Sequence, residues 1–221
     1  MAVKKYLVFN GTMTTESDLH VGASPDGDKI GGCDNPILRN KLTGEPFIPG
    51  SSLKGVMRFL KETTPAYKDK VSNGEPCSCG QPNCIVCKMF GSHKNKKPNS
   101  GLPRLIVSDL TINKEFKERL IASGMSPSDI VDIRTSNKVT RNPAIESRGL
   151  RNMEVISAGT VFDCSFKLRV QDTDNETELV NALKSLVTAV EVNSGIGSKL
   201  TSGCGKVKFD INYDKPETYT I

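Results

Sequence analysis

Alternation of hydrophobic and polar positions predicts four strands along the chain. Residues 3–14 have an apolar centre, and from 162 to 170 every second residue is apolar. The same period of two returns from 207 to 211, and an apolar run covers 105–110. A period of two is typical of a strand with one buried face. These segments therefore predict a sheet that is covered on one side.

Helical spacing of apolar residues begins directly after a Pro-Gly pair. Leu53, Val56, Met57 and Leu60 share one face, and the helix is expected to end near Thr63. Ser51 or Ser52 is expected to cap its first turn, because a hydroxyl there can accept from a free backbone N–H. Residues 178–191 predict a second amphipathic helix, and a short helical patch lies near 114–122.

The order of these elements predicts an α+β fold in one domain, residues 1–221. Residues 37–39 and 46–48 flank a turn and predict a hairpin. Residues 64–104 show only weak periodicity of apolar positions, which indicates an insertion, and this insertion contains most of the cysteines. Strands that alternate loosely with helices fit a ferredoxin-like sheet with helices on one face. The open face of such a sheet is a frequent RNA-binding platform.

Composition narrows the class of protein. The 221 residues carry a net charge of +5, which allows a polyanionic partner without requiring one. No apolar run reaches membrane-spanning length and no signal peptide is visible, so we expect a cytoplasmic protein without a membrane partner. Seven cysteines, four of them within 77–87, are typical of metal-binding thiols rather than of a disulfide framework.

The four clustered cysteines predict a structural zinc site. Cys77, Cys79, Cys84 and Cys87 could close a tetrahedron of thiolates around Zn²⁺. The Cys77–Cys79 spacing is tighter than usual, so His93 could replace one ligand. A redox-active pair is the alternative, but the surrounding sequence does not resemble a thioredoxin unit.

Two further stretches have the chemistry of a phosphate site. Ser51, Ser52 and Lys54 stand at a helix start, where free N–H groups favour an anion. The alternative is a well-capped amphipathic helix with solvated lysines. The glycine-rich loop 195–205 could bring backbone donors close to a ligand, or could be a plain connector.

Four motifs together give the chain a family resemblance. They are Leu19-His-Val-Gly22, Gly31-Gly-Cys-Asp-Asn-Pro36, Ile48-Pro-Gly-Ser-Ser-Leu-Lys-Gly55 with Arg58, and the glycine loop that runs into Lys206. Their order and spacing span nearly the whole chain. In these motifs the sequence resembles the RAMP superfamily of CRISPR-associated proteins, most closely the repeated backbone subunit of type III-A effector complexes.

The resemblance implies a modified RNA-recognition-motif palm with a projecting thumb hairpin, here residues 129–158. It also implies copies of the chain that line a CRISPR RNA as a filament, beside other type III effector subunits. A target RNA paired with the guide would be cut once per subunit, with a divalent metal ion such as Mg²⁺. The chain would then be a metal-dependent endoribonuclease.

The resemblance assigns roles to particular residues. Asp34 matches the family's cleavage loop and would be catalytic, whereas its residue type alone favours a turn aspartate. His20 would contact guide RNA, or else be a packed, hydrogen-bonded histidine. The expected RNA-binding residues are His20, Ser51, Ser52, Lys54, Arg58, Arg134, Lys138, Arg141, Gly195, Gly197, Ser198, Lys199, Gly203 and Gly205.

Two other functions stay open from the sequence. The chain could be a scaffold that binds guide RNA without cutting. It could also be a zinc-stabilised enzyme acting on a small phosphate compound. Evenly spaced cleavage of target RNA would exclude the scaffold, and salt-sensitive RNA binding weakened by Lys54→Ala would count against the small-molecule enzyme.

Overall fold

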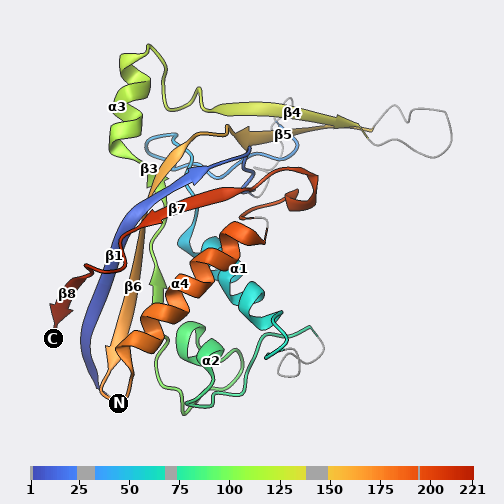
Figure 1. Ribbon diagram of the computed structural model, residues 1–221. Helices are drawn as coiled ribbons and strands as arrows, with labels where there is room; N and C mark the ends of the chain where they lie inside the picture. Colours follow the sequence, from blue (N-terminus) through green and yellow to red (C-terminus); the bar gives the residue numbers. More distant parts are fainter. Residues whose placement is uncertain (1, 24–32, 68–73, 138–148, 194) are drawn as a thin grey trace.

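The computed structural model describes residues 2–23, 33–67, 74–137, 149–193 and 195–221. It combines one large sheet, a separate two-stranded ribbon and four helices in the part of the chain that is described (Figure 1). The strands are β1 (Val3–Thr15), β2 (Leu105–Val107), β3 (Thr111–Ile112), β4 (Val131–Asn137), β5 (Leu150–Ile156), β6 (Val161–Gln171), β7 (Val207–Ile211) and β8 (Glu217–Thr220). The helices are α1 (Gly50–Glu62), α2 (Ile85–Phe90), α3 (Lys114–Ala122) and α4 (Glu176–Val192).

The large sheet is antiparallel and is built around β1 and β6. Its main path runs β2-β6-β1-β7, while β3 also pairs with β6 and β8 with β1. The β1–β6 register places Leu7 opposite Leu168 and Phe9 opposite Phe166. Both pairs are almost fully buried, so the period-two pattern of the sequence fixes this register.

Helices α1 and α4 pack on the apolar face of the sheet (Figure 1). Leu53 and Met57 of α1 and Leu183 and Val190 of α4 are fully buried there. The α+β class and the main strands and helices predicted from the sequence are confirmed. Among the described residues, no helix is long and apolar enough to span a bilayer.

The start of α1 differs from the expectation. The helix begins at Gly50 after Pro49, and neither Ser51 nor Ser52 caps it, so that prediction was wrong. Instead the carboxylate of Asp109 accepts from the N–H of Gly50 at 2.8 Å. Asp109 comes from the segment between β2 and β3, so an acid distant in sequence satisfies this helix end.

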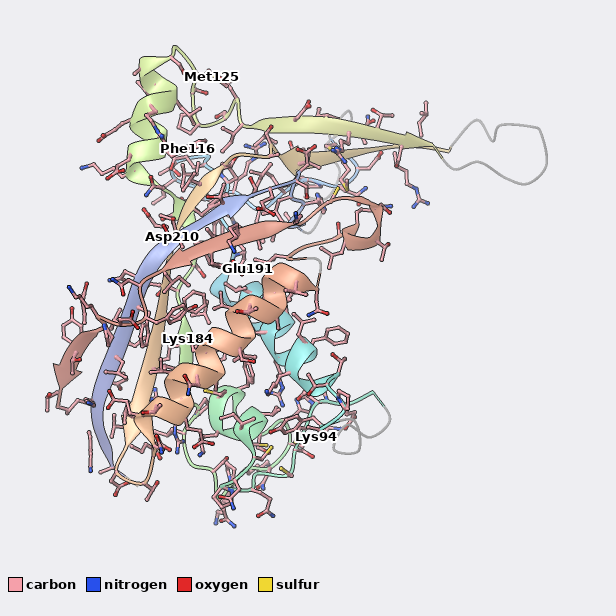
Figure 2. All side chains as sticks on the ribbon, viewed as in Figure 1. Lys94, Phe116, Met125, Lys184, Glu191 and Asp210 are labelled. Atoms are coloured by element: carbon pink, nitrogen blue, oxygen red, sulfur yellow. The ribbon has the colours of Figure 1, made fainter. Side chains whose placement is uncertain are left out.

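The β4–β5 ribbon projects from the body of the molecule (Figure 1). We call it the arm. It lies within the residues 129–158 expected to form a thumb, and its strands pair from Val131–Ile156 to Asn137–Leu150. Helix α3 stands near the base of the arm, and none of its residues is buried. Phe116 in the helix is half-buried, and Met125, just after the helix, is exposed (Figure 2).

Candidate functional site

Asp34 lies beside β5 of the arm, next to Asn152, which pairs with Thr135 of β4. Its Oδ2 accepts a 2.9 Å hydrogen bond from the backbone N–H of Asn152, 118 residues further along the chain. The neighbouring Asn35 pairs with Met153 in a parallel bridge. Asp34 is exposed, and no residue in the described ranges bonds its other oxygen. The carboxylate is therefore held on one side and open to solvent on the other. Asp26, Asp28 and the glycines before Cys33 lie outside the described residues.

His20 is buried next to strand β5. Only 6% of its surface is exposed, and its Nδ1 lies 2.7 Å from the backbone oxygen of Glu154. A carbonyl oxygen can only accept, so Nδ1 carries the proton in this bond. The neighbouring Leu19 bridges Ile156. His20 thus has the surroundings of a packed, hydrogen-bonded histidine two residues along β5 from the Asp34 contact.

The glycine loop packs against the segment that carries His20. The N–H of Ser198 donates to the backbone oxygen of His20 at 3.0 Å, and the N–H of Gly205 donates to that of Asp18 at 2.8 Å. A Cβ on Gly197 would come within 2.3 Å of the same His20 oxygen. Glycine is needed here for close packing within the chain, and several of the loop's N–H groups are already bonded.

The exposed parts of the loop remain accessible to a ligand. Gly197, Ser198, Lys199 and Gly203 are exposed, whereas Gly195 and Gly205 are buried. Lys199 has a φ of 60°, which is uncommon for a residue with a side chain. The exposed side chains of the loop therefore include one lysine, two serines and one threonine, namely Lys199, Ser198, Ser202 and Thr201.

Arg134 of β4 connects the arm to this loop. Its Nη2 lies 2.5 Å from Oδ2 of Asp18, and its Nη1 donates to Sγ of Cys204 at 3.4 Å. The pair is partly exposed, with 47% of the Arg134 side chain accessible. Two other basic residues expected to bind RNA, Lys138 and Arg141, lie outside the described residues.

Glu154 is a residue of this region that the sequence did not single out. Its carboxylate accepts from the N–H of Ile37 at 3.0 Å and from Nη2 of Arg39 at 3.3 Å. Its own N–H donates to the oxygen of Asn35. Glu154 thus attaches the segment after Asp34 to the arm. A single glutamate in an alternating strand gives no sequence signal for such a role.

Lys54 is the α1 residue best suited to an anion. Its Nζ donates to the backbone oxygen of Leu105 at 2.8 Å, and in the described ranges no carboxylate lies at ion-pair distance. Burial lowers the pKa of Lys54, and the nearby cations Arg169 and Arg58 lower it further. Ser51 is exposed and Ser52 is half-buried in the turn before it.

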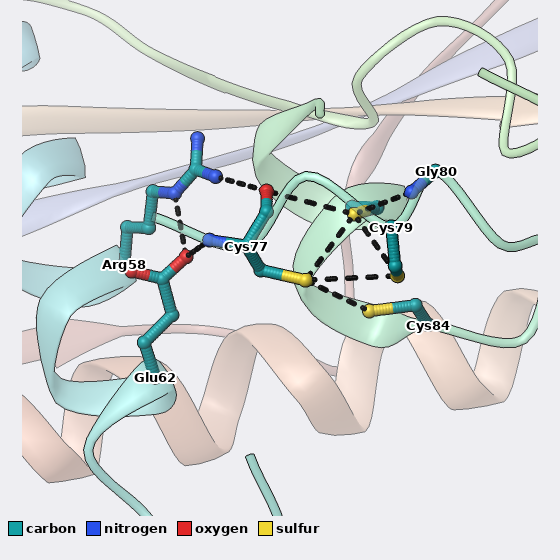
Figure 3. Close-up of polar contacts among 7 residues, drawn as sticks. Arg58, Glu62, Cys77, Cys79, Gly80 and Cys84 are labelled. Carbon is teal, nitrogen blue, oxygen red and sulfur yellow. Dashed lines mark hydrogen bonds and ion pairs between the residues drawn. The ribbon is translucent and has the colours of Figure 1, made fainter. Parts of the chain in front are cut away.

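Arg58 is turned away from that position toward the cysteine loop. Its Nε donates to Oε1 of Glu62 at 2.9 Å, and its Nη2 donates to the backbone oxygen of Cys77 at 2.9 Å (Figure 3). The two expected RNA-binding cations of α1 therefore have different surroundings. Among the described residues, Lys54 has no acidic partner, whereas Arg58 is paired with Glu62.

The structure brings the four clustered cysteines together, as the spacing predicted. The ligand atoms of Cys77, Cys79, Cys84 and Cys87 all lie within 4.8 Å of one another, and His93 is not part of this group. Four of the sulfur–sulfur distances are 3.6, 3.9, 3.7 and 3.7 Å. A tetrahedral Zn²⁺ with bonds of about 2.3 Å would separate its sulfurs by roughly 3.8 Å.

The clustered thiols differ in pKa. Burial alone would raise the pKa of Cys79, but hydrogen bonds from the Gln81 backbone and with the neighbouring thiols lower it. Burial raises the pKa of Cys77 and of Cys87, so without a positive charge nearby both stay protonated. In contrast, Cys164 lies apart from this group in the core, where burial raises its pKa to about 12. Cys164 is a small core residue, with only 4% of it exposed.

Comparison with known proteins gives one consistent result. The family model described as the RAMP superfamily matches residues 12–208. The CRISPR system Cms endoribonuclease Csm3 of Methanothermobacter thermautotrophicus is 32% identical, with 95% of this chain and 85% of that protein covered. The protein of the same name from Streptococcus thermophilus is 30% identical, with 91% and 86% covered.

Solved structures share the fold at lower identity. A Csm3 and Csm4 subcomplex of the type III-A CRISPR-Cas interference complex matches with a TM-score of 0.55 at 22% identity, covering 100% of this chain and 90% of that chain. The type III-B Cmr-beta structure in its apo state matches with a TM-score of 0.60 at 15% identity, covering 92% and 96%. The chain therefore belongs to the RAMP superfamily, in the branch that includes the Csm3 proteins.

Proposed function

We propose that this chain is the repeated backbone subunit of a type III CRISPR effector complex. In this role its copies bind CRISPR RNA as a filament, beside other effector subunits, and cut the paired target RNA at regular intervals. The similarity to proteins named endoribonuclease, at 30–32% identity over more than nine-tenths of the chain, supports the activity.

The position of Asp34 carries this proposal. An exposed carboxylate stands beside strand β5 of the arm, with one oxygen fixed by the Asn152 N–H. Other expected RNA-binding groups are the exposed part of the glycine loop with Arg134, which bonds Cys204 of that loop, and Lys54 on α1. This arrangement places an acid beside a strand that basic groups can hold by its phosphates.

The free oxygen of Asp34 suits a hard cation such as Mg²⁺, with waters and RNA phosphates completing the shell. A bound divalent cation would offset negative charge on the scissile phosphate. In the cleavage that we propose, the target 2′-oxygen attacks the adjacent phosphorus as its proton leaves. The bond to the 5′-oxygen then breaks and that oxygen takes up a proton, leaving a 2′,3′-cyclic phosphate and a 5′-hydroxyl. Asp34 contributes a carboxylate that β5 holds at a fixed place.

Zn²⁺ is the second metal that we propose, bound by Cys77, Cys79, Cys84 and Cys87. Four thiols at mutual distances close to those of a tetrahedral site support this assignment. The site is buried beneath α1 and far from Asp34 along the fold, so its role is to stabilise the segment 64–104.

The sheet order supports the palm that the family resemblance implies. Strands β1 and β2 are joined through α1, and β6 and β7 through α4, and each connection passes over one intervening strand. Two such split βαβ units make a ferredoxin-like or RNA-recognition-motif core. We propose that the β4–β5 arm is its thumb.

The test is Asp34→Asn in the assembled complex with guide, labelled target RNA and Mg²⁺. Loss of a metal-binding carboxylate should remove several kcal/mol of transition-state stabilisation, which is at least a ~100-fold loss of cleavage rate. Target binding, measured at equilibrium on the same preparation, should stay within about twofold because Asp34 makes no phosphate contact of its own.

Asp132→Asn is the matched control, because it removes one exposed acid from the neighbouring strand β4. It should cut at the wild-type rate. Wild-type cleavage by the Asp34 variant would reject the catalytic assignment. Absence of evenly spaced products from the wild-type complex would favour the scaffold function instead.

A further inference from the structure

The last turn of α1 binds the backbone of one cysteine from both sides. Arg58 Nη2 donates to the backbone oxygen of Cys77, and Oε1 of Glu62 accepts from the backbone N–H of Cys77, each at 2.9 Å (Figure 3). The same Glu62 oxygen also accepts from Arg58 Nε at 2.9 Å. One residue of the cysteine cluster is therefore held by a closed set of three hydrogen bonds.

This set is buried. Cys77 is 0% exposed, and the side chains of Arg58 and Glu62 are 18% and 8% exposed. A charged pair taken out of water loses hydration. The attraction between its two charges offsets this loss only where the geometry is good and further hydrogen bonds are made. Here the partner on both sides is the same backbone unit, and that unit carries a thiol of the proposed zinc site.

The charges also match. Four thiolates outweigh the charge of one Zn²⁺, so a site of this composition is anionic and favours a nearby guanidinium. A second donor acts at the other end of the cluster, where the N–H of Gly80 lies 3.3 Å from Sγ of Cys87. Groups of this kind, which orient metal ligands without touching the metal, typically change metal affinity by about 10–100-fold when removed.

We infer that Arg58 and Glu62 are positioning residues for Cys77, and that Arg58 does not contact RNA phosphate. The α1 motif then divides into two functions one turn apart. Lys54, which has no acidic partner among the described residues, faces the RNA. Arg58 and Glu62 together orient the Cys77 thiol toward the zinc ion. The part that concerns Lys54 rests on the proposed RNA binding, and the part that concerns Cys77 rests on the proposed zinc site.

The first experiment measures zinc on the full-length chain alone. Apparent zinc affinity is read by competition with a chromogenic chelator for wild type, Glu62→Gln, Arg58→Gln and Lys54→Gln. We expect about 10–100-fold weaker binding for the Glu62 and Arg58 variants and no change for the Lys54 variant. Wild-type zinc affinity in both Glu62→Gln and Arg58→Gln would overturn the inference.

The second experiment measures RNA affinity against salt at saturating zinc, with an unstructured single-stranded RNA as probe. Each lost phosphate contact makes the slope of log K against log salt shallower by roughly 0.7–0.9. Lys54→Gln should show this change, and Arg58→Gln should keep the wild-type slope. A shallower slope for Arg58→Gln would overturn the assignment of Arg58.

Glu62→Gln separates the two roles of Arg58 most clearly. If Arg58 bound phosphate, removing its acidic partner would strengthen RNA binding and leave zinc affinity intact, which would contradict the inference. We expect the reverse, weaker zinc binding with unchanged RNA affinity once zinc is saturating. If Glu62→Gln does not accumulate as folded protein, Arg58→Lys replaces it. The lysine keeps the positive charge but cannot contact both Glu62 and the Cys77 backbone, so we expect a loss of zinc affinity similar to that of Arg58→Gln. Wild-type zinc affinity in Arg58→Lys would overturn the inference.

Discussion

Helix α2, which carries Cys87, lies at the opposite end of the molecule from the β4–β5 arm (Figure 1). Three of the four clustered cysteines are buried, whereas Asp34 and the outer part of the arm are exposed. The cysteine end includes Arg104, whose Nε and Nη2 bond both carboxylate oxygens of Asp174 at 2.7 and 2.9 Å. Both side chains are only 2% exposed. At the arm end, Asp34 bonds the backbone N–H of Asn152, and the ion pair of Arg134 with Asp18 is partly exposed.

The difference separates two kinds of polar group. Buried charges at the cysteine end have partners inside the chain, and removing one partner leaves the other uncompensated. At the arm end, Asp34 and the exposed residues of the glycine loop keep bonding capacity that no described residue uses. Unused capacity at an exposed site suits a ligand. The two ends should therefore respond in opposite ways to substitution.

The largest stability effect is expected for Asp174→Asn. The variant leaves Arg104 buried without a counter-charge, which should lower the free energy of unfolding by about 3–5 kcal/mol. Urea unfolding of the zinc-loaded chain at neutral pH measures this. Asp214→Asn is the control, because Asp214 is 91% exposed and 3.9 Å from Lys184, and its loss should stay within about 0.5 kcal/mol. If Asp174→Asn lowered the free energy of unfolding by less than about 1 kcal/mol, the two ends of the molecule would not differ in their dependence on internal pairing.

The pH dependence of the same pair sharpens the comparison. Burial alone raises the pKa of Asp174, but bonds from Arg104 and from the N–H of Gln171 outweigh it and hold the pKa below its ordinary value. The pair therefore stabilises the fold fully above about pH 3.9 and loses this contribution as pH falls through the lowered pKa. The stability gap between wild type and Asp174→Asn should close in that acidic range.

Lys54→Met is expected to change stability less than Asp174→Asn and in the opposite direction. Its half-buried ammonium bonds one carbonyl and its pKa is lowered by burial, so removing the charge should leave the free energy of unfolding unchanged or raised. RNA affinity at low salt should fall roughly tenfold, as for the loss of one charged contact. A clear loss of stability together with normal RNA binding would show that Lys54 has a structural role.

The smallest effect is expected for Arg134→Gln. The ion pair with Asp18 is partly exposed, so its loss should lower stability by no more than about 1 kcal/mol. Thermal unfolding of the zinc-loaded variant checks this. A loss comparable to that of Asp174→Asn would mean that the arm end depends on internal pairing as strongly as the cysteine end.

Local patterns predicted much of the fold. Strands β1, β6 and β7 and helices α1 and α4 follow from apolar periodicity, because one face of each of these elements is buried. Helix α3 was also expected, although none of its residues is buried. The cysteine cluster follows from spacing within a single short segment. In contrast, the short helix α2 and the exposed strand β8 were missed. Helix α2 has only six residues, too few to show a clear period, and all four residues of β8 are exposed.

The sequence by itself determined the family, the sheet-forming segments, the four thiols and the identity of the candidate acid, since each depends on residues close together in the chain. Tertiary structure alone decided which partner each polar group takes. It placed Asp109 rather than Ser51 or Ser52 at the start of α1, Arg58 on Cys77, and Asp34 on a strand 118 residues away. Hydrogen bonds depend on distance in space, and a chain that folds back on itself makes that distance independent of separation in sequence.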